Sequence, residues 1–189
     1  MKKKYTIVGI DEAGRGPLAG PVVAASVEID EKYLPKEIND SKKVSEKNRN
    51  ILYKIILEEA CQYGIGIVHP KEIDEINIHN ATLKAMKMSY DSIKYKNCKV
   101  YIDGIFKPNI DNKESFAIKH GDRLVPIISA ASIIAKVTRD RIMLEIHEEF
   151  PEYNFKKHKG YPTKQHVEMI KKYGICKYHR KSFKPIKLL

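Results

Sequence analysis

The 189-residue chain has few cysteines and no long apolar run, and each absence excludes a class of protein. Cys61, Cys98 and Cys176 are an odd set without CxxC spacing, which argues against a disulfide scaffold or a zinc site. The longest mostly apolar stretch, 126–135, is much shorter than a membrane span. The apolar stretch behind the N-terminal lysines is too short for a signal peptide. We therefore expect a soluble, cytoplasmic protein without membrane association.

Acidic residues are scarce at one end of the chain. Lys and Arg outnumber Asp and Glu by 35 to 24 overall, a formal net charge of +11. Residues 151–189 carry a balance of +9, whereas residues 1–150 are nearly neutral at +2. We interpret 1–150 as the main domain and 151–189 as a basic C-terminal segment packed on it. The excess predicts a surface that contacts a polyanion, with a merely solvated tail as the alternative.

Strand-like and helix-like patterns alternate along the chain. Short β-rich runs predict strands at 5–10, 21–29, 63–68, 99–103 and 114–118. Helical spacing predicts helices at 45–60, 78–93, 126–150 and 163–173. The first two strands are so close in sequence that they should pair antiparallel. The third helix should bury a stripe made of Ile127, Ala130, Ile134, Val137 and Leu144. This order predicts an α/β fold with a mixed sheet flanked by helices.

Carboxylates stand at the ends of two predicted strands. Asp11 directly follows the first strand with Glu12 beside it, and Asp103 ends the fourth. Functional sites of α/β folds lie at such strand ends, although an acid there is also an ordinary turn residue. Adjacent strand residues point to opposite faces, so Asp11 and Glu12 share a site only if the chain leaves the strand there. The glycines that follow allow such a departure.

Asp122 is a fourth candidate acid, just before the long helix, where favourable contact with the helix dipole is the ordinary explanation. Four clustered carboxylates repel one another unless cations lie between them. Oxygen ligands of this kind suit Mg²⁺ or Mn²⁺ rather than zinc. Two such ions about 3.5–4 Å apart can activate a water and stabilise a leaving oxygen in phosphoryl transfer. An acidic metal site on a basic protein fits a polyanionic substrate.

A glycine-rich loop follows the first acids. In Gly14-Arg15-Gly16 the glycines let backbone amides approach a ligand closely, and the arginine can hold a phosphate. The loop lacks the Lys-Ser/Thr ending of a nucleotide P-loop, and no helix follows it as in a dinucleotide-binding fingerprint. Further along, Lys42 and Lys43 are candidate phosphate contacts, or else ordinary solvated lysines.

Seven segments resemble the ribonuclease HII family, the type 2 ribonucleases H. Those at 9–25 and 121–141 are long and specific, and all seven occur in the family's order over nearly the whole chain. The segments are 9–25 (GIDEAGRGPLAGPVVAA), 39–49 (NDSKKVSEKNR), 80–86 (NATLKAM), 101–104 (YIDG), 121–141 (GDRLVPIISAASIIAKVTRDR), 158–166 (HKGYPTKQH) and 179–185 (HRKSFKP).

The resemblance implies an RNase H-like mixed sheet flanked by helices, with a small helical C-terminal lobe. It implies endonucleolytic cleavage of RNA paired to DNA, including single ribonucleotides embedded in duplex DNA. The cut would lie 5′ of the ribonucleotide and leave 3′-hydroxyl and 5′-phosphate ends. Two Mg²⁺ or Mn²⁺ ions would take part. The expected partner is the RNA–DNA hybrid or ribonucleotide-containing duplex, and we expect a monomer without a protein partner.

The resemblance also assigns roles to residues. Gly14, Arg15 and Gly16 match the family's loop that senses the ribose 2′-hydroxyl. Tyr161 matches the tyrosine that packs on the sugar at the RNA–DNA junction, with an ordinary core aromatic as the alternative. The catalytic, metal-binding acids would be Asp11, Glu12, Asp103 and Asp122.

Two residues depart from the family pattern. His120 stands where lysine is usual before Gly-Asp, and His79 stands where an apolar residue is usual before Asn-Ala-Thr. Two other classes of function stay open on the residues alone. A non-catalytic nucleic-acid-binding module explains the basic segment but not the acids. A metal-dependent phosphatase acting on a small phosphoester explains the acids but not the basic segment.

Overall fold

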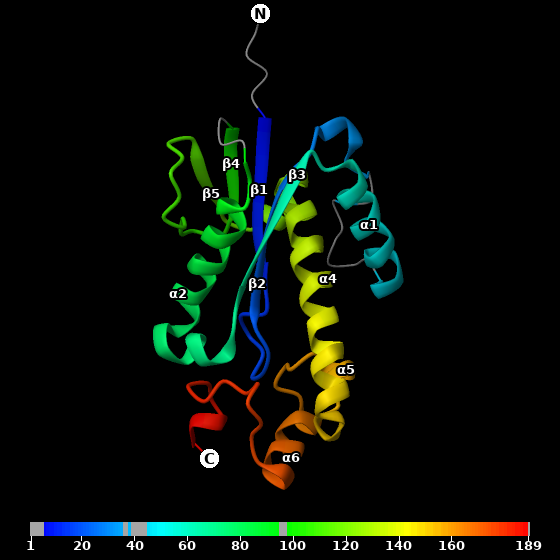
Figure 1. Cartoon of the computed structure of the whole chain (residues 1–189), viewed down its shortest axis with the longest axis vertical. Helices are drawn as coiled ribbons and strands as arrows, with labels where there is room; N and C mark the ends of the chain where they lie inside the picture. Colours follow the sequence, from blue (N-terminus) through cyan, green and yellow to red (C-terminus); the bar gives the residue numbers. More distant parts are fainter. Residues whose placement is uncertain (1–5, 36–37, 39–44, 95–97, 189) are drawn as a thin grey trace, which may run out of the picture.

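The fold is given by a computed structural model that describes residues 6–35, 38, 45–94 and 98–188. Its centre is a five-stranded mixed sheet with the strand order β3-β2-β1-β4-β5 (Figure 1). The first two strands pair antiparallel, as predicted, and β1 also pairs parallel with β4. The strands are β1 (Thr6–Ala13), β2 (Val22–Glu28), β3 (Gln62–Val68), β4 (Cys98–Asp103) and β5 (Ser115–Ile118).

Helices cover both faces of the sheet (Figure 1), which confirms the predicted fold class. One face packs against α2, and the other against α1 and α4. Short 3₁₀ turns at Glu31–Tyr33, Pro151–Tyr153 and Ile186–Leu188 complete the described elements. The helices are α1 (Glu46–Glu59), α2 (Pro70–Asp91), α3 (Gly121–Leu124), α4 (Pro126–Glu149), α5 (Phe155–His158) and α6 (Lys164–Tyr173).

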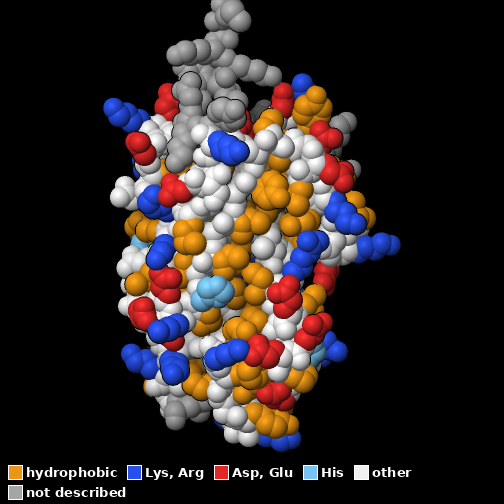
Figure 2. Space-filling view, viewed as in Figure 1, with side chains coloured by type: hydrophobic (Ala, Val, Ile, Leu, Met, Phe, Trp, Pro, Cys, Tyr) orange, Lys and Arg blue, Asp and Glu red, His pale blue; other side chains and the backbone are white. Residues whose placement is uncertain are grey.

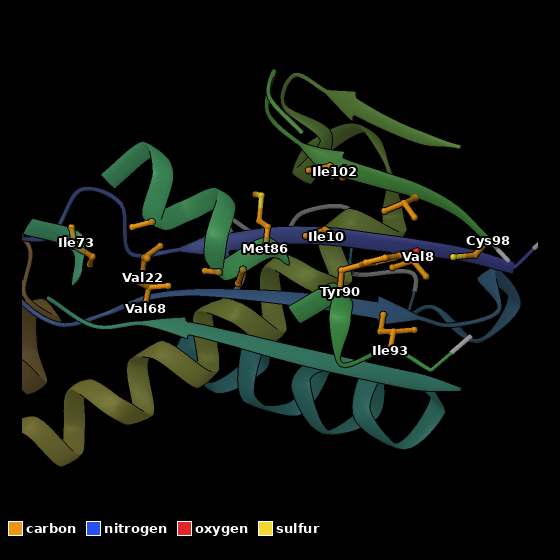
Figure 3. Packing of buried hydrophobic residues seen from close by; sticks show 14 residues of the cluster. Val8, Ile10, Val22, Val68, Ile73, Met86, Tyr90, Ile93, Cys98 and Ile102 are labelled. Carbon is orange, nitrogen blue, oxygen red and sulfur yellow. The ribbon is translucent and has the colours of Figure 1, made fainter. Parts of the chain in front are cut away.

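The core consists of two apolar layers separated by the sheet. Every residue of β2 is buried because helices cover both of its faces. In Figure 3, Met86 and Tyr90 of α2 lie against the β1 side chains Val8 and Ile10. Each such side chain contributes roughly 1.5–3 kcal/mol on burial. The close packing of α2 also explains why β3 carries Gly66, because a Cβ there would lie 2.0 Å from a helix carbonyl oxygen.

Two of the predicted helices differ from the structure in detail. The second begins at Pro70 rather than near residue 78, and Asn77, with φ +64°, interrupts its helical geometry. In α4 the predicted stripe is buried as far as Val137, but Leu144 is exposed. Beyond the sheet, the C-terminal segment covers a different face of α4, so Met143 is buried there instead.

The basic C-terminal segment shares an apolar cluster with the rest of the chain. Leu18 and Ala19, from the loop between β1 and β2, pack with Met143 of α4 and with Phe155 and Ile170 from the segment. The face seen in Figure 2 mixes acidic and basic side chains along both flanks of an apolar middle, so the positive charge is not concentrated there. No helix in the described ranges has both the length and the apolar composition needed to cross a bilayer.

Candidate active site

Strand β1 continues through the first two candidate acids. Asp11 pairs with Ala25 and Glu12 with Ala24 in the antiparallel ladder with β2, and the strand ends only at Ala13. The prediction that the chain leaves the strand at Asp11 is therefore wrong. The two carboxyl groups start from opposite faces of a regular strand, and another feature must bring them together.

The feature that brings them together is the end of the neighbouring ladder. Parallel pairing between β1 and β4 stops at Ile10 with Ile102, so Asp11 and Glu12 lie beyond the last paired residues. A side chain on either face can therefore turn toward the open end of β4, where Asp103 stands. Carboxylate oxygens of these three acids all lie within 4.8 Å of one another.

Asp122 reaches this group through its backbone. Its N–H donates a hydrogen bond to Asp103 Oδ1 at 3.2 Å, and its carbonyl oxygen accepts one from Ser129 Oγ at 2.7 Å. The residue is buried in the first turn of α3. Within the described ranges, the carboxylates that share the 4.8 Å spacing are those of Asp11, Glu12 and Asp103, while the Asp122 carboxylate stands outside that spacing.

The carboxylates of the three acids repel one another. Burial, followed by the charges of Glu12 and Asp103, raises the pKa of Asp11 well above its usual value. Burial also raises the pKa of Glu12, although the guanidinium of Arg15, 3.4 Å from Glu12 Oε1, opposes this shift. A divalent cation bound between the carboxylates would remove the repulsion. An all-oxygen donor set fits a hard ion such as Mg²⁺ or Mn²⁺.

The two glycines of the loop face different surroundings. Gly14 has φ +99°, and a Cβ there would lie 2.2 Å from Nε of the buried Arg139. The nearest atom to a Cβ on Gly16 would be Cε1 of Tyr161, at 3.8 Å. Gly14 is therefore required by the packing behind the loop, whereas Gly16 keeps open a space in front of it.

A buried arginine that the sequence analysis missed holds this loop from behind. Arg180 is fully buried, and its guanidinium donates to the carbonyl oxygens of Gly14 at 2.6 Å, Arg15 at 3.1 Å and Gly20 at 2.8 Å. Burial lowers its pKa to about 9, so the side chain stays protonated near neutral pH. With their carbonyl groups bound to Arg180, Gly14 and Arg15 cannot rotate freely.

Arg139 is a second buried arginine of the same kind. Asp140, its neighbour in sequence, binds Lys136 at 2.7 Å. Arg139 links the loop between β1 and β2 to the turn before Tyr161. It does so by donating to the carbonyl oxygens of Ala19, Pro21 and Lys159.

Tyr161 lines a hollow of about 420 Å³ together with the glycine-rich loop. The residue is 41% exposed, which does not fit an ordinary core aromatic. The Nζ atom of Lys136 lies 5.8 Å from the ring centroid. Other residues that line the hollow are Glu12, Gly14, Arg15, Gly16, Arg49 and Ser132.

The two histidines that depart from the family pattern lie on the other side of the acids. His79 and His120 line a second hollow, of about 250 Å³, which contains Asp103 and shares Glu12 and Arg15 with the first. The acids therefore stand where the two hollows meet. The candidate phosphate contacts at 42 and 43, Lys42 and Lys43, fall outside the described residues.

Comparisons with known proteins point to one family. The family model described as Ribonuclease HII matches residues 8–186. The Ribonuclease HII of Francisella philomiragia is 55% identical over 183 residues, which cover 97% of this chain and 98% of that protein. The ribonuclease H2 of Pyrococcus horikoshii superposes with a TM-score of 0.81 at 28% identity, covering 97% of this chain and 96% of that one.

A second archaeal structure bears on partners. The Archaeoglobus fulgidus RNase HII, with a TM-score of 0.80, 27% identity and 95% of both chains covered, was solved in a complex with PCNA. A protein partner is thus known for one similar protein, which the expectation of no protein partner did not foresee. The family match over nearly the whole chain excludes both a non-catalytic binding module and a small-phosphoester phosphatase. This chain belongs to the ribonuclease HII family, and it is a metal-dependent endoribonuclease that acts on RNA–DNA hybrids.

Proposed function

We propose that this enzyme also cuts at single ribonucleotides embedded in duplex DNA, on the 5′ side of the ribonucleotide, leaving 3′-hydroxyl and 5′-phosphate ends. The observation that carries the proposal is the position of Tyr161 and the Gly14-Arg15-Gly16 loop around one hollow that Glu12 also lines. Groups that read the sugar would then lie beside the groups that cut the backbone.

The acids Asp11, Glu12 and Asp103 fit a divalent cation site because their oxygens converge and burial raises the pKa values of two of them. Asp122 would complete the set from the adjoining helix turn. When bound there, two Mg²⁺ or Mn²⁺ ions would supply the activation of a water and the stabilisation of the leaving oxygen. Arg15, whose guanidinium lies 3.4 Å from Glu12 Oε1, would hold a phosphate of the substrate beside these acids.

Recognition of the ribonucleotide would come from the backbone of the loop. The 2′-hydroxyl is the group that tells RNA from DNA on the sugar, and backbone amides can bond it. The carbonyl groups of Gly14 and Arg15 bind Arg180, which leaves the front of the loop to the substrate. At Gly16, the absence of a side chain lets the sugar approach closely.

Tyr161 would press its flat face on the neighbouring deoxyribose, where an additional 2′-hydroxyl would crowd the ring. The loop and the tyrosine together would therefore read a junction between RNA and DNA. Lys42 and Lys43 remain proposed phosphate contacts. The exposed lysines of residues 151–189 would contact duplex phosphates farther from the cut. We also propose that the active unit is a monomer.

The test is single-turnover cleavage of matched duplexes containing one ribonucleotide, a run of ribonucleotides, or none, with and without Mg²⁺. Tyr161→Ala should slow cleavage at the single ribonucleotide roughly ten- to a hundredfold, since a lost stacking contact is worth ~1–3 kcal/mol. Tyr161→Phe, which keeps the flat face, is the matched control and should stay close to wild type. Equal rates for Tyr161→Ala and wild type would contradict the proposed junction contact. Mass analysis of the ends would test the position of the cut.

A further inference from the structure

Three buried histidines lie behind the turn that carries Tyr161. His158, His166 and His179 are all less than a tenth exposed, and none of them takes part in the proposed reaction. The rings of His158 and His166 stack at 4.5 Å with an angle of 19° between them. Burying three ionisable rings is costly unless they stay neutral and hydrogen-bonded, so the arrangement of their protons matters.

The partners of His166 fix where its proton lies. Its Nδ1 is 3.0 Å from the carbonyl oxygen of Tyr161, which can only accept, so Nδ1 carries the hydrogen. In a neutral ring the other nitrogen is then an acceptor. His166 Nε2 lies 3.1 Å from His179 Nε2, so His179 must donate to it.

The second ring completes the chain. With its hydrogen on Nε2, His179 has a free acceptor at Nδ1, and the backbone N–H of Cys176 donates to that atom at 2.9 Å. One proton arrangement therefore satisfies every member, from Cys176 through His179 and His166 to Tyr161. Burial lowers the pKa of both histidines to about 4, so both rings are neutral near pH 7.

We propose that His166 and His179 are positioning residues, which hold the Tyr161 backbone through this hydrogen-bond chain and so aim its ring at the hollow. The proposal rests on the function proposed above for Tyr161. Tyr161 is 41% exposed, so side chains such as Lys136 and Arg139 cover only part of it, and the backbone also sets the direction of the ring.

The backbone of Tyr161 has three anchors. Its carbonyl oxygen accepts from His166 Nδ1 and from the N–H of Thr163, the latter at 2.8 Å, and its own N–H donates to the carbonyl oxygen of His158 at 2.9 Å.

A soft-metal site is the competing explanation for histidines beside a cysteine. Metal ligands must converge on one point, whereas these nitrogens are paired in a line. His166 Nδ1 pairs with the Tyr161 carbonyl, the two Nε2 atoms pair with each other, and His179 Nδ1 meets the N–H of Cys176 and, at 3.1 Å, its thiol sulfur. In the described parts of the chain, the one group of three or more potential ligand atoms close enough to hold an ion is the acidic cluster. A metal bound at the histidines is therefore an outcome that the experiment must be able to detect.

The experiment replaces His166 with asparagine or with glutamine, whose side-chain amides lie at different distances from the backbone. Asparagine places its amide near the imidazole Nδ1 position, and glutamine places its amide near Nε2. His166→Asn should keep the bond to Tyr161, whereas His166→Gln should lose it and lower kcat/KM at a single ribonucleotide by roughly five- to tenfold, about one hydrogen bond. His69→Gln, at an exposed histidine, is the surface control. Since His166 acts through Tyr161, the double variant Tyr161→Ala/His166→Gln should be no slower than Tyr161→Ala.

Multiplying losses in the double variant would overturn the proposal, because they would mean that His166 acts independently of Tyr161. A second measurement needs no variant: ¹⁵N NMR of the wild-type protein should show hydrogen on Nδ1 of His166 and on Nε2 of His179. The opposite tautomers, or stoichiometric zinc lost when His179 is replaced, would also refute it. If Tyr161→Ala cleaves like wild type, the function proposed for Tyr161 fails. The positioning role of the histidines is then decided by NMR alone, from the two tautomers and from the change in the Tyr161 carbonyl ¹³C shift in His166→Gln.

Discussion

The two glycines of the loop should fail in different ways when each is replaced by alanine. At Gly14 the backbone has φ +99°, which costs an L-residue roughly 1–2 kcal/mol. The new methyl would also lie 2.2 Å from Nε of Arg139, which is buried and cannot move aside without losing its bonds to carbonyl groups. Each such charged hydrogen bond is worth about 1.5–3 kcal/mol. We therefore expect Gly14→Ala to lower the free energy of unfolding by roughly 3–5 kcal/mol.

Gly16→Ala should leave the free energy of unfolding within about 0.5 kcal/mol of wild type. The φ angle of Gly16 lies outside the left-handed region, and the new methyl would meet only Tyr161 Cε1, at 3.8 Å. That methyl would nevertheless occupy the hollow where we propose that the sugar binds. Cleavage at a ribonucleotide should therefore fall while the fold stays intact.

The assay pairs thermal unfolding with single-turnover cleavage of a duplex holding one ribonucleotide. For a chain of this size, the loss expected for Gly14→Ala is a fall in Tm of roughly 6–20 °C. Gly16→Ala should melt with the wild type and cleave more slowly. The reasoning is refuted if both variants are destabilised equally, or if folded Gly16→Ala cleaves at the wild-type rate.

Two further perturbations test the acids and the histidines. Asp103→Asn keeps an oxygen to accept the Asp122 N–H, so it should fold normally yet lose most of its activity even in saturating Mg²⁺; near-wild-type turnover would contradict its assignment as a metal ligand. His166 and His179 have folded pKa values of about 4 against 6.5 in the unfolded chain, so the unfolded state binds more protons between these values. Their contribution to the free energy of unfolding should be complete above pH 6.5 and lost as the pH falls toward 4. Measurements of Tm against pH should show this loss, and His166→Asn should make it smaller.

Local patterns were sufficient to predict most of the fold. The strands and the antiparallel pairing of β1 with β2 follow from short alternating or apolar runs, which depend on neighbours in sequence. The sequence prediction missed the start of α2, because Asn77 has a positive φ and interrupts the helix there. Leu144 was assigned to the core because its spacing continues the stripe of α4, but the element packed on that part of the helix decides which face is buried.

Asp11, Glu12 and Asp103 could be grouped from the sequence because they lie just beyond the last paired residues of β1 and β4, whereas Asp122 lies in the first turn of α3. The supports of the loop could not be found in the same way. Arg139 and Arg180 bind backbone carbonyl groups more than 100 residues away, and a carbonyl group looks the same at every position in a sequence. Asp140, the acid next to Arg139 in sequence, binds Lys136 and has no part in holding the loop. Only the folded chain shows that these guanidiniums serve the loop.

Residues 151–189 combine two tasks that their composition does not distinguish. All of their Lys and Arg residues contribute equally to the charge balance of +9, yet Arg180 is buried behind the loop while most of the lysines are exposed. Deleting the segment would therefore remove the support of Gly14 together with the proposed phosphate contacts. Substitution of exposed lysines such as Lys156 and Lys164 changes the charge alone. The loop depends on the segment for its shape, whereas the duplex would depend on it for attraction, and the two are carried by different side chains.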